Sequence, residues 1–309
     1  MIPEHFHIWT SADLFDTLKR SFQGQYKDND VHSEFLCVDR YRFYRAEFAG
    51  GALDEYLSTF NSLPGGDQDA PVYLDDHYAQ LKMMAAYNWR SLWYNPGCAI
   101  APDPVPVHDG ELSTLDALDQ VALLLTKPTL SQCYAWLDAW AVPENIRRHA
   151  ELVAWMAYVL GVLLSDQGVQ LDPILAHRGG LLHDLDKLHT LDHAQPHGEM
   201  GAAFLAQKGH PGLAEIVSGH VMRTALQADK TSLTWETRLV FFCDKLAEED
   251  RIVPFDVRLR ALKERYPVFS GVMDQAAPYV WMLSEDICSI LSIPSHENLI
   301  NILSELQNS

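Results

Sequence analysis

The chain has 309 residues, of which 48% are apolar, and its formal net charge is −19 at neutral pH. This length suffices for two domains that each bury a core. The acidic balance repels polynucleotide phosphates and argues against DNA or long RNA as a partner, whereas a bound metal can reverse the field locally and admit a small phosphorylated molecule. The five cysteines are scattered without a CxxC pair, which argues against a disulfide framework and a thiolate zinc site.

The first residues, MIPEHFHIW, lack the basic start and the apolar core of a signal peptide. The most apolar run, 150–164, is shorter than a bilayer span and contains Glu151. We therefore expect a cytoplasmic protein without a membrane partner. The sequence leaves its oligomeric state open.

Residues 1–127 have the alternating pattern of a small α/β domain with a Rossmann-like sheet. Apolar residues at helical spacing after Ser11, a plausible cap, predict its first helix. In chain order we expect a helix over 11–22, a strand over 35–38, a helix over 52–63, a turn over 64–69, a strand over 71–74, a helix over 77–88, a strand over 91–94, a loop over 101–110 and a last helix over 111–125. Lys127-Pro128-Thr129 marks the expected domain boundary.

Two aspartates, Asp75 and Asp76, follow the strand expected over 71–74. Ligands of open parallel sheets bind at the carboxyl ends of strands, so this position is a candidate site. The segment PVYLDDHYAQLKMMAAYNWRSLWYNPG resembles the last motif of the haloacid dehalogenase-like (HAD) hydrolases, and the resemblance implies that the acidic pair helps to hold magnesium.

The nucleophile motif of the same family has a counterpart in the letters DLFDTL, which begin at Asp13. The preceding residues, HIWTSA, do not have the pattern of the strand that this motif requires, and helical spacing explains Leu14, Phe15 and Leu18 without any chemistry. We therefore expect a reduced HAD-like scaffold that serves as an accessory domain.

Residues 128–309 have a helical pattern throughout, which predicts an all-α domain. The expected helices cover 144–165, 172–188, 198–208, 212–221 and 234–252, with two or three more in 257–307. In the second of these, Asp172 is a candidate N-cap and Pro173 occupies the first helical position. Its far end carries an adjacent His183 and Asp184, which can face one metal ion if the helix ends or kinks there.

Histidines and aspartates recur along this half in surroundings that favour burial. His149 lies near the start of a long apolar helix, His220 follows the apolar segment IVSG, and Asp244 lies within LVFFCDKL. A buried carboxylate needs a cation or a hydrogen-bond donor, and a mixed set of imidazole nitrogens and carboxylate oxygens suits Fe, Mn, Co, Zn, Ni or Mg.

The order of these residues resembles the HD-domain (HDIG-like) metal-dependent phosphohydrolases over about residues 142–258. The flanks agree with it: VPENIRRHAELVAWMA around His149, GGLLHDLDKL around His183 and Asp184, and FFCDKLAEEDRIVPFDVRL around Asp244. The resemblance implies an HD helical bundle in which these four residues hold one metal ion.

The same resemblance implies further site residues. His197 and His220 match the additional histidines of dinuclear members, in which the central aspartate, here Asp184, bridges the metals. His189, His193 and His210 remain alternatives to His197. The resemblance also implies that Lys187 binds phosphate or stabilises the aspartate, and Arg148 and Arg223 are candidate phosphate contacts.

The expected function is metal-dependent hydrolysis of a phosphoester or phosphoanhydride bond in a small, nucleotide-like molecule, with one or two divalent ions lowering the pKa of a bound water to give hydroxide. The segment SGHVMRTAL lacks the His-His-Glu and GYP elements of the enzymes that cleave cyclic dinucleotides, which disfavours that activity. Two alternatives remain: a non-catalytic module that binds metal and nucleotide, and a phosphatase whose chemistry lies in the HAD-like domain.

Overall fold

The computed structural model describes residues 6–21, 35–38, 41–46, 72–86, 90–97, 99–102, 106–112, 126–190, 197–226 and 233–308. The chain divides into two compact units. The first comprises Met1–Gly97 with Val107–Thr129, and the second comprises Cys98–Pro106 with Leu130–Ser309. The proline-rich segment that we expected as a loop of the first domain is thus divided between the two units.

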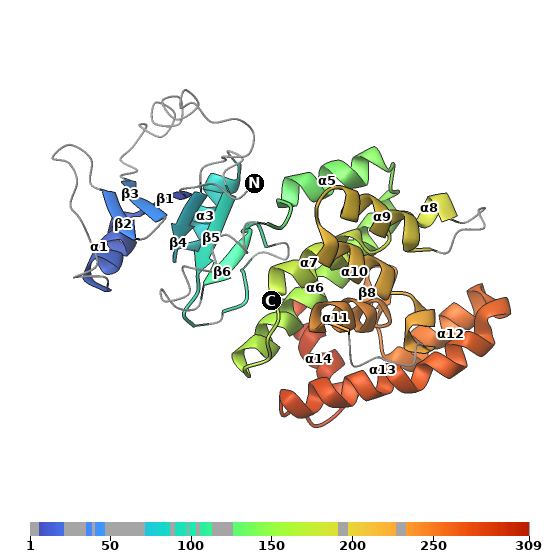
Figure 1. Cartoon of the computed structure of the whole chain (residues 1–309). Helices are drawn as coiled ribbons and strands as arrows, with labels where there is room; N and C mark the ends of the chain where they lie inside the picture. Colours follow the sequence, from blue (N-terminus) through green and yellow to red (C-terminus); the bar gives the residue numbers. More distant parts are fainter. Residues whose placement is uncertain are drawn as a thin grey trace. The chain divides into compact units, whose positions relative to one another are not determined.

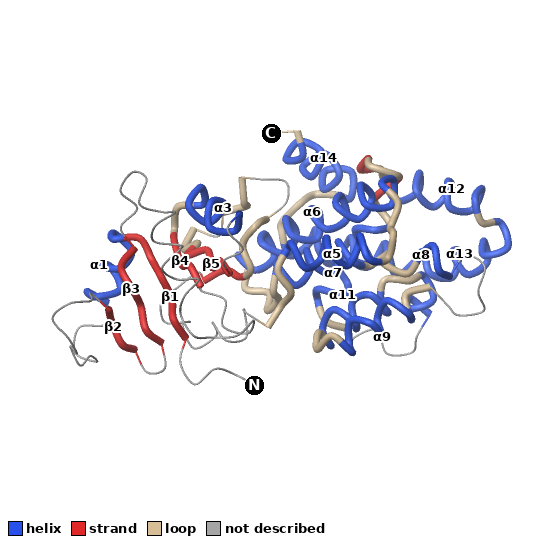
Figure 2. The backbone as a smooth tube through the Cα atoms, turned by 90° about the horizontal axis from the view of Figure 1, so that it is seen from above, coloured by secondary structure: helices blue, strands red, loops and turns tan. Residues whose placement is uncertain are grey.

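The first unit is built on a mainly parallel sheet (Figure 2). Its described strands are β1 (Phe6–Ser11), β2 (Phe35–Val38), β3 (Tyr41–Ala46), β4 (Val72–Asp75), β5 (Arg90–Tyr94) and β6 (Gly110–Leu112). They lie in the order β2-β3-β1-β4-β5-β6, and only β2, at one edge, is antiparallel to its described neighbour. This arrangement confirms the α/β class of the unit, while its HAD-like character remains a prediction.

Several elements of the first unit confirm the sequence pattern. Helix α1 (Ala12–Ser21) buries Leu14, Phe15 and Leu18, and α3 (Tyr78–Ala86) follows β4 as expected. The helix expected over 52–63 and the turn over 64–69 lie outside the described residues.

Two predictions for this unit are wrong. The segment HIWTSA, which does not have the pattern of a strand, belongs largely to β1, a strand that pairs with β3 on one side and β4 on the other. Pairing on both sides outweighs weak local propensity, as is usual for a central strand. The helix expected over 111–125 cannot begin at its first residue, because Glu111 and Leu112 belong to β6.

The described part of the second unit is mainly helical, which confirms the predicted helical domain (Figure 1). Its elements are α5 (Leu130–Ala139), α6 (Glu144–Asp166), α7 (Pro173–Leu182), α8 (Lys187–Thr190), α9 (Glu199–Gln207), α10 (Pro211–Gly219), η2 (Met222–Leu226), α11 (Trp235–Asp244), β7 (Ala247–Glu248), β8 (Arg251–Ile252), α12 (Phe255–Arg265), η3 (Pro267–Phe269), α13 (Ser270–Ile290) and α14 (His296–Gln307). No described helix is both long and apolar enough to cross a membrane.

The helix expected over 234–252 is wrong in its second half. Helix α11 ends at Asp244, and β7 and β8 then form an antiparallel hairpin. The polar turn of this hairpin contains Glu249, whose φ of 56° lies in the left-handed region. The chain therefore reverses direction at the β7–β8 turn, a few residues after Asp244, and β7 contacts α6.

Helices α6, α7 and α11 pack against one another and form the core that carries the site (Figure 1). The predicted start of α7 is confirmed, because the Asp172 side chain accepts hydrogen bonds from the backbone N–H groups of Ile174 and Leu175, and Pro173 is the first helical residue. Glycine allows α7 to approach α6 closely: a Cβ atom on Gly180 would lie 2.6 Å from the Cα of Ala154.

Candidate metal centre

The predicted ligands lie at the ends of helices that meet in the interior of the second unit. His149 belongs to the second turn of α6, His183 directly follows α7, and Asp184 follows His183. His220 directly follows α10, and Asp244 is the last residue of α11. All but Asp244 are buried, and the Asp244 side chain is only 14% exposed.

These residues form two groups whose ligand atoms all lie within 4.8 Å of one another. The first group is His149, His183 and Asp244, in which His149 Nε2 lies 3.1 Å from Asp244 Oδ1. The second group is His183, Asp184 and His220, in which His183 Nε2 lies 3.5 Å from Asp184 Oδ2. His183 is common to both groups, so the two clusters are adjacent.

Backbone carbonyls fix the orientation of the three buried imidazoles. The Nδ1 atoms of His149, His183 and His220 lie 3.1, 2.6 and 2.6 Å from the carbonyl oxygens of Glu249, Gly180 and Val217. A carbonyl oxygen only accepts hydrogen bonds, so each Nδ1 carries the proton and each Nε2 of the neutral ring has a free lone pair. Hydrogen bonding of the distal nitrogen is the usual way in which proteins orient metal-binding histidines.

The surroundings of His183 Nε2 fit a cation. This buried atom has no hydrogen-bond partner among the described residues, and carboxylate oxygens of Asp184 and Asp244 lie 3.5 and 3.8 Å away. Lone pairs of a nitrogen and two carboxylates facing one another are unfavourable unless a cation lies between them. A divalent ion would satisfy all three groups, and the mixed nitrogen and oxygen set is suitable for one.

His197 lies beside the second group and connects it to another carboxylate. Its Nε2 is 2.7 Å from Asp184 Oδ1 and 3.1 Å from His220 Nε2, and its Nδ1 is 2.8 Å from Asp186 Oδ1. Asp186 is held in place by the backbone N–H groups of Gly198 and Gly201. Asp186 was not among the predicted site residues, although it lies in the same HDLDK segment as His183 and Asp184.

The alternatives to His197 do not join the cluster where they are described. His189 packs against Trp140, and His210 packs against Trp136 before α10. His193 lies outside the described residues.

Burial and neighbouring charges shift the acid–base properties of the cluster in opposite directions. Burial lowers the pKa of His183 to about 4 and, together with the nearby histidines, holds the pKa of His220 well below its usual range. Burial would lower the pKa of His197 as well, but its contacts with Asp184 and Asp186 raise it to about 9. Without a metal ion, His183 and His220 are thus neutral imidazoles whose Nε2 lone pairs can bind a cation. His197 is then an imidazolium cation bound to two carboxylates.

The carboxylates remain ionised in spite of their burial. Burial alone would raise the pKa of Asp184, but the Lys187 ammonium and the nearby histidines hold it well below its ordinary value. Lys245 and His149 have the same effect on the pKa of Asp244. Lys187 binds an oxygen of Asp184, as the sequence resemblance implies for a residue that stabilises this aspartate.

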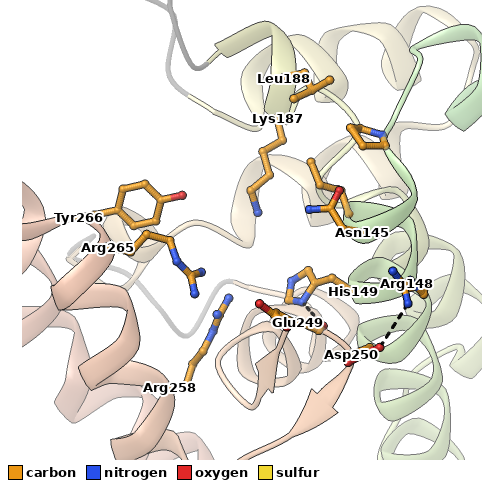
Figure 3. A pocket seen from close by; sticks show the side chains of 12 residues that line it. Asn145, Arg148, His149, Lys187, Leu188, Glu249, Asp250, Arg258, Arg265 and Tyr266 are labelled. Carbon is orange, nitrogen blue, oxygen red and sulfur yellow. Dashed lines mark hydrogen bonds and ion pairs between the residues drawn. The ribbon is translucent and has the colours of Figure 1, made fainter.

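A pocket of about 620 Å³ opens beside the first group (Figure 3). Its lining residues are Pro143, Asn145, Ile146, Arg148, His149, Lys187, Leu188, Glu249, Asp250, Arg258, Arg265 and Tyr266. Two predicted phosphate contacts, Arg148 and Lys187, are among them. The third, Arg223, does not line this pocket. It belongs to η2, and its guanidinium group lies 2.8 Å from the carboxylate of Glu199.

Two further cations of the pocket, Arg258 and Arg265, were not predicted from the sequence. Both belong to α12, and both bind the carboxylate of Glu248 in the β7–β8 hairpin. Burial would raise the pKa of Glu248, but the two guanidinium groups lower it. Only the fold brings these residues together, because the hairpin replaces the predicted continuation of α11.

The acidic pair of the first unit forms a separate small cluster at the end of β4. Asp75 Oδ2 accepts a hydrogen bond from the Tyr73 hydroxyl at 2.6 Å, and its Oδ1 accepts one from the backbone N–H of His77 at 2.8 Å. Asp75, Asp76 and His77 could together hold an ion. Asp13 lies two residues after the end of β1, in the first turn of α1, and both Asp13 and Asp16 are exposed.

Comparisons with known proteins agree with this geometry. The family model for the HD domain matches residues 144–249, which include every predicted metal ligand. An uncharacterized protein of Methanocaldococcus jannaschii is 29% identical over 159 residues, covering 48% of this chain and 90% of its own. Ribonuclease Y of Clostridium perfringens is 28% identical over 131 residues, covering 42% of this chain but only 24% of its own.

The comparison with solved structures found no match. The family match and the two adjacent histidine–aspartate groups lie in the same segment of the second unit. Residues 144–249 of this chain are therefore an HD domain.

Proposed function

We propose that the second unit is a metal-dependent phosphohydrolase that cleaves a phosphoester or phosphoanhydride bond in a small, nucleotide-like molecule. The observation that carries this proposal is the arrangement of two histidine–aspartate groups, which share His183, beside a pocket lined by basic side chains. His149, His183, Asp184, His197, His220 and Asp244 are the proposed ligands of one or two divalent ions. When bound, such ions activate water and neutralise charge on phosphoryl oxygens.

The protein side chains have separate tasks in this proposal. Asp184 is a suitable bridging ligand, because its Oδ2 faces His183 while its Oδ1 faces His197 and His220. Lys187 lies between Asp184 and the pocket, where its ammonium group can hold a phosphoryl oxygen. In the reaction, a water oxygen forms a bond to phosphorus, the bond to the leaving oxygen breaks, and that oxygen takes up a proton. The small accessory unit at the N-terminus has no step in this reaction.

The match to ribonuclease Y favours a second candidate, the hydrolysis of a phosphodiester bond in RNA. The net charge of −19 disfavours a long polyanion, and the basic groups of the pocket are accompanied by Glu249 and Asp250. A short oligonucleotide is the form of RNA that is compatible with this surface. Comparing a dinucleotide with mononucleotides as substrates distinguishes the two candidates.

The first test is the metal content of the purified protein, together with hydrolysis of bis(p-nitrophenyl) phosphate and a nucleotide panel. We expect two ions per chain in the wild type, one in His220→Ala, and no turnover in Asp184→Ala, which should keep its fold. His189→Ala is the matched control, because its ring packs against Trp140 outside the cluster, and it should retain both metal and activity.

Other outcomes favour the remaining alternatives. One ion that is unaffected by His220→Ala indicates a mononuclear centre. Failure to bind metal even after reconstitution, with retained nucleotide binding, would contradict the enzyme and favour a binding module. Loss of activity in Asp13→Asn, with full activity in His183→Ala, would place the chemistry in the first unit.

A further inference from the structure

We propose that Lys187, Arg258 and Arg265 form an anion-binding subsite for a second phosphate group, so that the preferred substrate carries at least two phosphates. This inference deepens the proposed function and rests on it. The three residues come from α8 and α12 and line the same pocket. Figure 3 shows their charged ends pointing toward a common space.

The arginine pair, Arg258 and Arg265, has more hydrogen-bond donors than its partner can accept. Arg258 Nη1 and Arg265 Nη2 bind different oxygens of Glu248. Each guanidinium group has five N–H donors, so one carboxylate leaves several of them for a ligand. The Nε of Arg258 is buried and has no hydrogen-bond partner among the described residues, although Arg258 lines the pocket.

The charge of the pocket is divided between its two sides. On one side, Arg148 is accompanied by Glu144 and Asp250, at 3.8 and 3.7 Å. On the other side, both arginines bind Glu248, and Arg258 Nη2 also lies 3.9 Å from Asp244 Oδ1, which the proposed function assigns to the metal centre.

Lys187 is bound to Asp184, which the proposed function commits to the metal centre. The side formed by Lys187 and the arginine pair is therefore the positive one. Arginine forks of this kind match the oxygens of phosphate groups.

The position of the subsite decides which substrates benefit from it. Lys187 contacts a proposed metal ligand and also lines the pocket, so it connects the reaction centre with the arginine pair. A monophosphate at the centre would reach Lys187 alone, whereas a diphosphate would extend to the arginine pair. The pocket volume of about 620 Å³ lies in the range of sites for molecules much larger than phosphate, and Tyr266 and Leu188 at its wall offer an apolar surface for the rest of the substrate.

The test compares the binding of inorganic phosphate and inorganic pyrophosphate by calorimetry, with and without the metal that the purified protein carries. We expect pyrophosphate to bind at least tenfold more tightly than phosphate to the wild type. In Arg265→Gln, pyrophosphate binding should weaken about tenfold, which corresponds to about 1.4 kcal/mol, with phosphate binding nearly unchanged. Arg265 is 45% exposed, so its replacement should preserve the fold.

Arg260→Gln is the matched control, because it removes the same charge from the same helix at an exposed residue outside the pocket. It should bind both anions as the wild type does. Equal weakening in both variants would indicate a general charge effect and overturn the subsite. Equal affinity of the wild type for the two anions would overturn it as well. A subsite that binds pyrophosphate in a protein without metal or turnover would refute the proposed function alone.

Discussion

Replacing Gly180 by alanine should separate the two helices that carry His149 and His183. The new Cβ would lie 2.6 Å from the Cα and 2.9 Å from the N of Ala154, whereas ordinary contact begins at 3.4 Å. Because both atoms belong to the backbone of α6, no side chain can move aside, and the helices must shift by about 0.8 Å. Overpacking costs up to about 3 kcal/mol, and the higher helix propensity of alanine returns about 1 kcal/mol, so we expect a net loss of about 2 kcal/mol.

The same shift should weaken metal binding. Metal–ligand distances tolerate deviations of about 0.2 Å, and Gly180 also supplies the carbonyl oxygen that orients the ring of His183. We expect the affinity for the metal to fall at least about tenfold, in line with the effect of losing a group that orients a ligand. Urea unfolding of the metal-free protein and a metal titration measure the two effects separately.

Two glycines provide the controls for this substitution. Gly271 lies in the first turn of α13 with open space around its Cβ position, so Gly271→Ala should leave stability unchanged or increase it slightly. Gly219→Ala would meet only the Cγ2 of Thr237 closely, at 2.4 Å, and Thr237→Ser should rescue it. A Gly180→Ala protein with wild-type stability and metal affinity would refute the close approach of α6 and α7.

Two predictions concern stability outside the site. Ala141 lies in the turn that follows α5 and has a φ of 50°, in the left-handed region that favours glycine. Ala141→Gly should therefore stabilise the protein by about 1 kcal/mol, and an unchanged or lower urea midpoint would contradict this conformation. Burial lowers the pKa of His296, whose Nε2 accepts the backbone N–H of Phe255 and whose Nδ1 lies 2.8 Å from the hydroxyl of Ser284. Because the unfolded chain then binds the proton more readily, the contribution of His296 is complete above pH 6.5 and is lost as the pH falls through its folded pKa. The stability difference between the wild type and His296→Asn, measured in metal-free protein, should shrink from pH 7 to pH 5, and a constant difference would exclude this account.

Local sequence signals predicted the parts of the fold that local interactions determine. Asp172 and Pro173 mark the start of α7 because a cap and a fixed φ act within one turn of the chain. Strand β1 was missed because its stability comes from β3 and β4, which lie far from it in the sequence. Apolar residues at helical spacing continue beyond Asp244, so the sequence predicted a longer α11. The β7–β8 hairpin that follows Asp244 instead was found only in the structure.

The metal site could be predicted as far as the order of its histidines and aspartates along the chain matches that of the HD-domain family. His149, His183, Asp184, His220 and Asp244 follow from that order, and the structure places their ligand atoms in two adjacent groups. His197 was the preferred match between Asp184 and His220, with His189, His193 and His210 as alternatives, and the contact distances place His197 beside Asp184. The sequence did not predict a role for the arginine pair, because charged residues on α12 are typical of a solvent-exposed helix. Only the structure brings both arginines to Glu248.

The β7–β8 hairpin contacts both functional areas within a few residues. Glu249 offers its carbonyl oxygen to His149, Glu248 binds the arginine pair, and Asp250 lies 3.7 Å from Arg148. Inserting or deleting one residue here would exchange the faces of the hairpin and displace all three contacts together. The length of this exposed turn is therefore constrained by the metal centre and the arginine pair at the same time.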